Sequence, residues 1–551
     1  MTDIAPRSAD IVMRLDRLGA SHPTRLSFLR ALMRQAEREQ WQIWPSTWQI
    51  NDEGYGHAVI QVNMPRRSYS LVAFSTPLED SRRTDRVIAD AWDTSYVLYD
   101  GVPDEAEIER LAENAPLQEA GRFAACDLIL SRANKSVRLF EHVVDSLADG
   151  RQPNAELLES VGYLMRTTAV YGNGKFGIAD RDLIFNRPEF AGPFRAEMLT
   201  VWLIRSFTVA LAEYVAARRS PERAVKLTPA IRRALGVGNS TGLGMAPFLV
   251  RHPILMHHWF AAREKALARV RSLVAADRQA IAGFMTALSA MRENLRRWRT
   301  EDEGQLAANV RLTNDLDLLE HNAPEILRIN TRPWDALYRF ADSKLSLEGT
   351  EATVALLLEP YGALVDDLAD TMTADEGPAS RIDGEMNCGA LKALIATHYS
   401  WAAYDFDDPQ ANARFWYVSE EKLEPRLGER QFEVGAELEQ PLAIARDVAR
   451  LACALSEEAE HISVAAFLLQ YPEWRHLVRR VQMAERYQYS EIHGNLIDAS
   501  IRPVDLLRCK LAFFGASRFD PRSDRWLRIS LFAGALFPEE ICAPNELQAA
   551  S

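Results

Sequence analysis

A long succession of segments with apolar residues at three- and four-residue spacing constrains this chain most strongly. Such spacing is typical of helices that bury one face. It occurs at residues 125–147, 156–171, 195–218, 253–299, 351–371, 389–403, 441–459 and 464–487. We therefore predict a mainly α fold, in which a large multi-helix domain makes up most of the chain.

The N-terminal part has a different period. Residues 57–64 and 68–75 alternate apolar and polar side chains around a Pro65-Arg66-Arg67 turn, which predicts a β-hairpin. Residues 41–50 and 87–99 are candidates for further strands of the same sheet. We therefore expect a small N-terminal α+β module to precede the helical domain.

A turn-rich stretch divides the helical part. Residues 373–387 (TADEGPASRIDGEMN) contain many residues that favour turns. The predicted domains are an α+β module over 1–120, a helical domain with two glycine-rich loops over 121–372, and a helical domain that completes the candidate site over 373–551.

The segment 253–299 is unusually long for one globular helix. Its apolar stripe favours two helices of one chain packed together, and the alternative is a seam between chains. A seam between chains would make the protein a homodimer or a larger homo-oligomer.

Charge and apolar content limit the other partners. The net charge is −13, and basic residues are interleaved with acidic ones, so no basic face for nucleic acid is expected. The most apolar stretch, 198–217, carries Arg205 and Glu213, which favours a buried core helix over a membrane span. We predict a small-molecule substrate, with neither nucleic acid nor membrane as a partner.

The cysteines and the N-terminus indicate the compartment. The five cysteines are far apart, without a CxxC pair, and residues 1–10 lack the basic start and apolar core of a secretory signal. A cytoplasmic location is expected. The spacing of His252, His257 and His258 does not place two imidazoles on one helix face, so no metal site is predicted.

Two glycine-rich segments are candidates for anion binding. The first, 171–177 (YGNGKFG), offers Asn173 and Lys175 and is followed by Arg181. Glycines expose backbone N–H groups, and the cations attract a phosphate or carboxylate. Both glycine-rich segments are expected to follow helices, so a helix-terminating turn is the alternative for the first. The second, 236–248, places Asn239, Ser240 and Thr241 among four glycines, and its alternative is a simple helix cap.

Two polar segments are candidates for acid–base chemistry. Residues 388–417 contain His398, Tyr404 and Asp405 among aromatic side chains, so His398 and Asp405 are a candidate oriented pair. Residues 491–503 interleave polar side chains with isoleucine and leucine; the candidates there are Glu491, His493, Asn495 and Arg502. The alternatives are an aromatic turn with a satisfied histidine and a structural polar network.

A fifth segment, 319–340, contains Arg332 near two prolines and a tryptophan. A guanidinium binds carboxylate or phosphate in a bidentate way, so Arg332 is a candidate substrate clamp, and a shaped connection between helices is the alternative.

Three functional hypotheses follow. The first is an enzyme that acts on a small anionic metabolite by general acid–base chemistry, with His398 and His493 as acid and base and Asp405 or Glu491 as the orienting group. The second is an oxidoreductase whose glycine-rich loops hold the phosphates of an organic cofactor of unknown identity. The third is a non-catalytic helical scaffold. All catalytic assignments require these distant segments to share one enclosed site.

Overall fold

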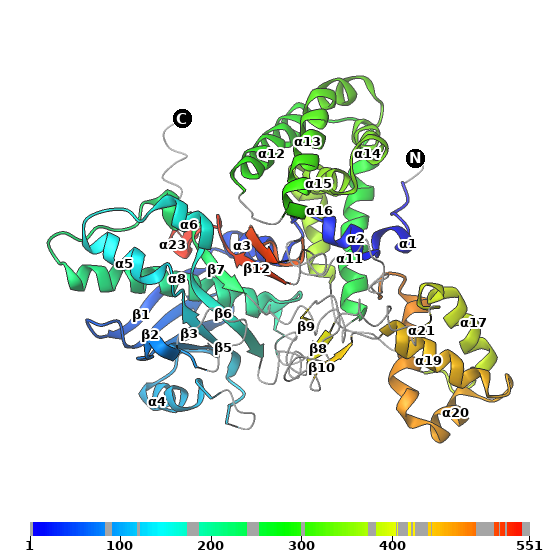
Figure 1. Ribbon diagram of the computed structural model, residues 1–551, viewed down its shortest axis with the longest axis horizontal. Helices are drawn as coiled ribbons and strands as arrows, with labels where there is room; N and C mark the ends of the chain where they lie inside the picture. The colour runs from blue at the N-terminus through cyan, green and yellow to red at the C-terminus, as the bar shows by residue number, and fades with distance from the viewer. Residues whose placement is uncertain are drawn as a thin grey trace. The chain divides into compact units, whose positions relative to one another are not determined.

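Contacts within the computed structural model divide the chain into two compact units. The helical unit comprises residues 1–22, 245–509 and 522–526, and the sheet unit comprises residues 23–244, 510–521 and 527–551. Figure 1 shows the elements of both units in chain colours. The residues that the structure describes are 4–82, 91–117, 122–172, 184, 187–239, 253–298, 303–372, 382–403, 405, 417–419, 423–424, 439–441, 444–491, 508, 512–516, 518–523 and 526–542.

A nine-stranded mixed sheet forms the framework of the sheet unit (Figure 1). Its strands are β1 (Gln42–Ile50), β2 (Gly56–Asn63), β3 (Ser68–Ser75), β4 (Thr94–Asp100), β5 (Asp127–Lys135), β6 (Tyr163–Gly172), β7 (Gly236–Asn239), β11 (Arg518–Ser523) and β12 (Trp526–Leu531). They lie in the order β1-β2-β3-β4-β5-β6-β7-β12-β11. Neighbours from β1 to β6 are antiparallel, β6 and β7 are parallel, and β12 is antiparallel to β7.

The predicted hairpin is confirmed. Strands β2 and β3 pair from Gly56 opposite Ser75 to Asn63 opposite Ser68. The turn is closed by the Met64 N–H, which donates to the Arg67 carbonyl at 3.0 Å. The predicted strand at 41–50 is β1, and the later part of 87–99 belongs to β4.

The prediction of a mainly α chain with only a small N-terminal α+β module is wrong, because the sheet is much larger. Strands β5, β6 and β7 lie beyond residue 120, and β11 and β12 come from the C-terminal part of the chain. In the two segments predicted as helix, residues 127–135 and 163–171 belong to β5 and β6, whereas residues 140–147 and 156–161 are helical, as predicted. Eight of the nine residues of β5 are buried. A strand covered on both faces lacks the alternation that distinguishes it from a buried helix.

Helices cover both faces of this sheet. On one face, Phe207 of α8 (Arg195–Arg219) lies 5.9 Å from the ring of Tyr96 in β4. On the other face, Leu111 of α4 (Glu105–Asn114) shares a hydrophobic cluster with Val97. Since successive strand residues point to opposite faces, α8 and α4 enclose the sheet. The other helices of this unit are α3 (Phe28–Arg38), α5 (Phe140–Ala148), α6 (Ala155–Val161), α9 (Pro229–Ala234) and α23 (Pro538–Cys542).

Helix α8 is, among the described residues, the one helix long and apolar enough to cross a membrane. However, 78% of its apolar window is buried within the protein. Its Arg205 is buried as well, with Nε donating to the carbonyl of Leu235 at 2.7 Å. These properties are those of a core helix and are consistent with a soluble protein.

The helical unit consists mostly of α-helices. They are α1 (Ala9–Val12), α2 (Leu15–Ala20), α11 (Pro253–Arg271), α12 (Arg278–Arg297), α13 (Glu303–Ile329), α14 (Pro333–Lys344), α15 (Leu347–Leu358), α16 (Gly362–Val365), α17 (Cys388–His398), α19 (Ile444–Ser456), α20 (Val464–Gln470) and α21 (Arg475–Arg486). A three-stranded sheet of β8 (Tyr417–Ser419), β9 (Leu423–Glu424) and β10 (Glu439–Pro441) belongs to the same unit.

The long segment 253–299 is divided into two helices, but the predicted close packing of these two helices against each other is not seen among the described elements. Helix α11 ends at Arg271, and α12 begins after Asp277, whose side chain accepts a hydrogen bond from the Ala280 N–H at 2.7 Å. Helix α12 packs against α13, with ion pairs from Arg292 to Asp317 and Glu320. The seam between chains and the oligomeric state stay predictions.

The predicted domain boundaries at residues 120 and 372 also stay predictions. They divide the chain into consecutive segments. Each contact-defined unit instead combines segments that are far apart in the sequence. The core of α17, α19, α20 and α21, which includes Leu391, Val448, Phe467 and Val481, illustrates the packing of one such part.

Candidate functional site at the carboxyl ends of β6 and β7

Both predicted glycine-rich segments begin at the carboxyl end of a strand. The first overlaps the last two residues of β6, Tyr171 and Gly172, and the second includes all of β7. Strands β6 and β7 are parallel neighbours, with Arg166 opposite Gly238 and Thr167 opposite Asn239. The expectation that these segments follow helices is therefore wrong. Both strands run toward the same edge of the sheet, but β7 ends opposite Thr167, whereas β6 continues for five further residues to Gly172.

Two glycines of the second segment are required by packing in β7. A Cβ at Gly236 would lie 2.3 Å from the Leu531 carbonyl oxygen, and a Cβ at Gly238 would lie 2.5 Å from Cδ1 of Tyr163. Both glycines thus allow β7 to fit between β6 and β12. Their presence is explained without a ligand, which leaves Gly242 and Gly244, outside the described residues, as the glycines available for anion binding.

The start of β5 lies at the same edge of the sheet. Ile129 pairs with Gly172, and Asp127 pairs with Tyr99 near the end of β4. A charged group therefore lies close to the point where the chain leaves β6.

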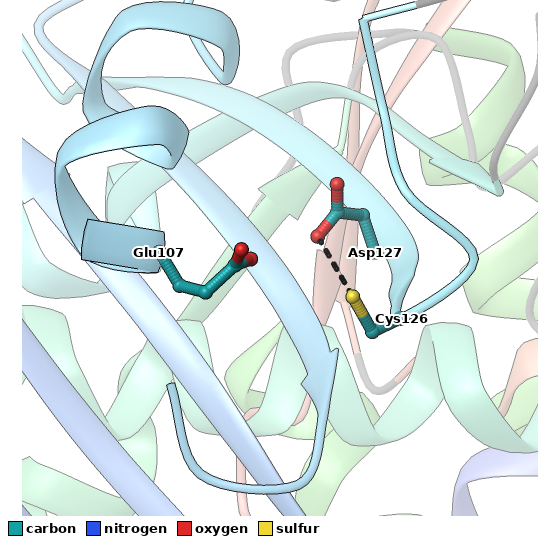
Figure 2. A group of neighbouring side chains, drawn as sticks. All are labelled: Glu107, Cys126 and Asp127. Carbon is teal, nitrogen blue, oxygen red and sulfur yellow. Dashed lines mark hydrogen bonds between the residues drawn. The ribbon is translucent and has the colours of Figure 1, made fainter. Parts of the chain in front are cut away.

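Glu107, Cys126 and Asp127 form a group at this edge whose ligand atoms lie within 4.8 Å of one another (Figure 2). Arg110 already bonds to both carboxylates, because its Nη2 donates to Glu107 at 2.7 Å and to Asp127 at 2.8 Å. Its Nη1 donates to the second oxygen of Asp127 at 2.8 Å. A metal ion would have to displace this guanidinium, so the donor set does not fit a metal; it fastens α4 to β5.

The predicted site residues of the sheet unit fall mostly on the two segments that follow these strands. Asn239 is the last residue of β7. Asn173, Lys175, Arg181, Ser240 and Thr241 lie outside the described residues. Their proximity to one another stays a prediction, supported by the parallel arrangement of the strands that precede them.

The remaining predicted residues belong to the helical unit. His398 is the last residue of α17 and is half-buried, and Asp405 is exposed. Arg332 is the residue that precedes α14, and its carbonyl accepts a hydrogen bond from Ala336 N–H at 2.9 Å. Tyr404, His493, Asn495 and Arg502 lie outside the described residues. The required convergence of both sets of residues on one site stays a prediction.

Glu491 lies in a buried polar network, which is the alternative that the sequence left open for its segment. Its Oε1 and Oε2 accept hydrogen bonds from Arg480 Nε at 2.5 Å and Nη2 at 2.9 Å, and Tyr399 Oη donates to Oε1 at 2.9 Å. All three residues are buried. Burial and the Glu491 carboxylate raise the pKa of Tyr399, so the phenol stays protonated as a donor. Glu491 is thus engaged at both oxygens.

A second group of buried charges was missed in the sequence. Arg7, Arg17 and Arg263 all bond to Glu351, and Arg7 also binds Glu264; we call these five residues the Glu351 cluster. Burial alone would raise the pKa of Glu351, but the three arginines hold it far below its usual value. The available signal was Arg263-Glu264 and Glu351 inside otherwise apolar helical segments.

Comparisons with protein-family models, with curated proteins and with solved structures find no match for this chain.

Proposed function

We propose that this chain is an enzyme that holds the phosphate or carboxylate group of a small metabolite at the carboxyl ends of β6 and β7. One observation carries the proposal: two parallel neighbouring strands both lead into glycine-rich segments at the same edge of the sheet. In sheets with parallel strands, ligands bind in the crevice outside the carboxyl ends of the strands. The glycine-rich composition then has a functional use beyond the packing of β7.

The chemistry of these segments suits an anion. Backbone N–H groups at Asn239, Ser240 and Thr241 would donate to the ligand, and Lys175 and Arg181 would supply positive charge in a chain whose net charge is −13.

The catalytic step is proposed as general acid–base chemistry by His398 and His493. Imidazole changes its charge near neutral pH, which suits proton transfer. Asp405 is the proposed orienting carboxylate, because Glu491 is already engaged by Arg480 and Tyr399. The described acids at the β6 edge, Glu107 and Asp127, are bonded to Arg110 and are not assigned this role.

An organic cofactor with a phosphate group is the second candidate ligand. Phosphate-binding loops usually follow strands, and this supports the candidate because both glycine-rich segments follow strands. The cofactor would be detected as absorbance or fluorescence of the purified protein. In both cases we propose a cytoplasmic protein that works on a small molecule, as a single chain or a homo-oligomer.

Ligand binding to the full chain tests the proposal. We would measure Tm and binding heat with phosphate, pyrophosphate, citrate, ATP and NAD as probes, for the wild type and for Lys175→Gln and Arg181→Gln. We expect at least one probe to raise Tm of the wild type and each substitution to weaken its binding at least about tenfold, since a charge-assisted contact is lost. Lys226→Gln, an exposed lysine of the same unit, is the matched control. Unchanged binding in both variants would contradict the proposal.

A further inference from the structure

The Glu351 cluster, in the helical unit, has more positive than negative charge. It contains the cations Arg7, Arg17 and Arg263 and the carboxylates of Glu264 and Glu351. The side chains of Arg7 and Arg263 are only 5% and 4% exposed, and both carboxylates are fully buried. An uncompensated charge in such an environment is costly unless a counter-ion accompanies it.

The hydrogen bonds of the cluster are unequally shared. Arg7 binds Glu264 through Nε and Nη2 at 2.7 Å each and Glu351 through Nη1 at 2.6 Å, so all of its nitrogens are used. Arg263 donates to Glu351 through Nη2 alone. Within the described part of the chain, its buried Nε and Nη1 have no hydrogen-bond partner, and Nη1 lies 3.7 Å from Glu264 Oε1. Buried N–H groups of a cation rarely lack a hydrogen-bond partner.

His22 has a second buried nitrogen without a hydrogen-bond partner among the described residues, and it faces Glu348 of α15. Glu348 and Glu351 are three residues apart in this helix and so share a face. His22 Nε2 is 3.8 Å from Glu348 Oε1, which is too long for a hydrogen bond, and it is buried without a partner among the described residues. Burial lowers the pKa of His22, so its ring is neutral near pH 7 and one of its nitrogens can still donate.

We propose that a small monovalent anion, either chloride or a single carboxylate group, binds at Arg263 and His22. It would accept hydrogen bonds from Arg263 Nε and Nη1 and from His22 Nε2, and its charge would balance the Glu351 cluster. The burial of both groups limits the anion to a small one. Arg7, Arg17 and His22 all come from the first 22 residues, so the anion would help to fasten this segment to α11 and α15.

The test compares small and large monovalent anions on the full chain. We would measure Tm in equal concentrations of sodium chloride, bromide, formate and gluconate, because gluconate keeps the ionic strength but is too large to enter. The wild type is expected to have a Tm several degrees higher in the three small anions, by ligand linkage. Arg263→Gln and His22→Phe are expected to lose this difference. Arg269→Gln, on the same helix and paired with Asp367 at the surface, is expected to keep it.

Crystals of the full chain grown in bromide give a second readout, which stays decisive where a variant does not fold. An anomalous bromide peak next to Arg263 and His22 supports the site. A water molecule there instead, an equal Tm of the wild type in all four salts, or the same salt difference in Arg263→Gln and the wild type, overturns the proposal.

Discussion

Gly238 of β7 lies against the ring of Tyr163 of β6, so that a Cβ at Gly238 would come within 2.5 Å of Cδ1 and 2.6 Å of Cε1 of that ring. The contact brings the two parallel strands together where the second glycine-rich segment begins. It therefore holds β7 against the first residues of β6.

Gly238→Ala is expected to destabilise the sheet unit, because the added methyl group overlaps a ring within a packed sheet. We expect a loss of about 1–3 kcal/mol in the free energy of unfolding by urea denaturation. Much of this loss should be recovered in the double variant Gly238→Ala with Tyr163→Leu. Gly283→Ala is the control, since the nearest atom to its new Cβ is 3.6 Å away and alanine favours the helix. Equal stability of Gly238→Ala and the wild type would refute the packing account.

Arg205→Met is expected to destabilise the same unit by about 3 kcal/mol, because buried carbonyls lose their donors. Arg205 donates to Leu235 at 2.7 Å, Ala535 at 2.9 Å and Arg233 at 3.2 Å, so it joins α8 to the start of β7 and to the C-terminal segment. Chemical denaturation and proteolysis of residues 530–542 are the measurements. Arg218→Met removes a surface ion pair of the same helix and should be nearly neutral. Similar losses in both variants would argue against this role of Arg205.

Glu351→Gln is expected to lower the free energy of unfolding by about 3–5 kcal/mol, because three buried arginines lose their common carboxylate. The exposed Glu293→Gln in α12 is the control and should be nearly neutral. Denaturation of the helical unit measures both. A small effect of Glu351→Gln would show that the Glu351 cluster is readily hydrated and would weaken the case for a buried anion.

Stability is expected to fall as the pH drops from 6.5 to about 4, partly because of His257. Burial and then the neighbouring His258 lower the pKa of His257 from 6.5 to about 4. Its Nδ1 accepts a hydrogen bond from the Tyr489 N–H at 3.1 Å, which requires that nitrogen to be unprotonated. In this pH window the unfolded chain binds a proton that the folded chain does not, a difference worth about 3 kcal/mol at its full extent.

The measurement for His257 is the free energy of unfolding as a function of pH. His257→Phe keeps an aromatic ring beside Tyr489 and should show a shallower fall between pH 6.5 and 4. The exposed His321→Phe of α13 should keep the wild-type slope. The same slope in His257→Phe and the wild type would contradict the assignment.

The sequence predicted elements whose residue pattern or length is visible along the chain. The hairpin β2–β3 was identified because its alternation is visible, and α8 because its apolar run is long enough for a core helix. Strand β5 was mistaken for helix because its two covered faces remove the alternation. Residues 163–167 of β6 are likewise all buried. Strand β7, with the sequence GVGN, has little strand propensity and depends on its neighbours β6 and β12.

The candidate site was predicted in its composition but not in its placement. The glycine-rich segments were recognised, yet the role of Gly236 and Gly238 in packing depends on Leu531 and Tyr163, which are distant in the sequence. The Glu351 cluster was not predicted, because residues 7, 17, 263 and 351 meet only through tertiary packing. Spacing along the chain carries no information on such contacts.

Hydrogen exchange of the full chain with and without pyrophosphate tests the central claim most directly. If the carboxyl ends of β6 and β7 bind an anion, peptides that cover residues 171–181 and 237–244 should both exchange more slowly with pyrophosphate present. This protection should disappear in the double variant Lys175→Gln with Arg181→Gln. Pyrophosphate binding without protection of either peptide, or protection confined to other parts of the chain, would contradict the account.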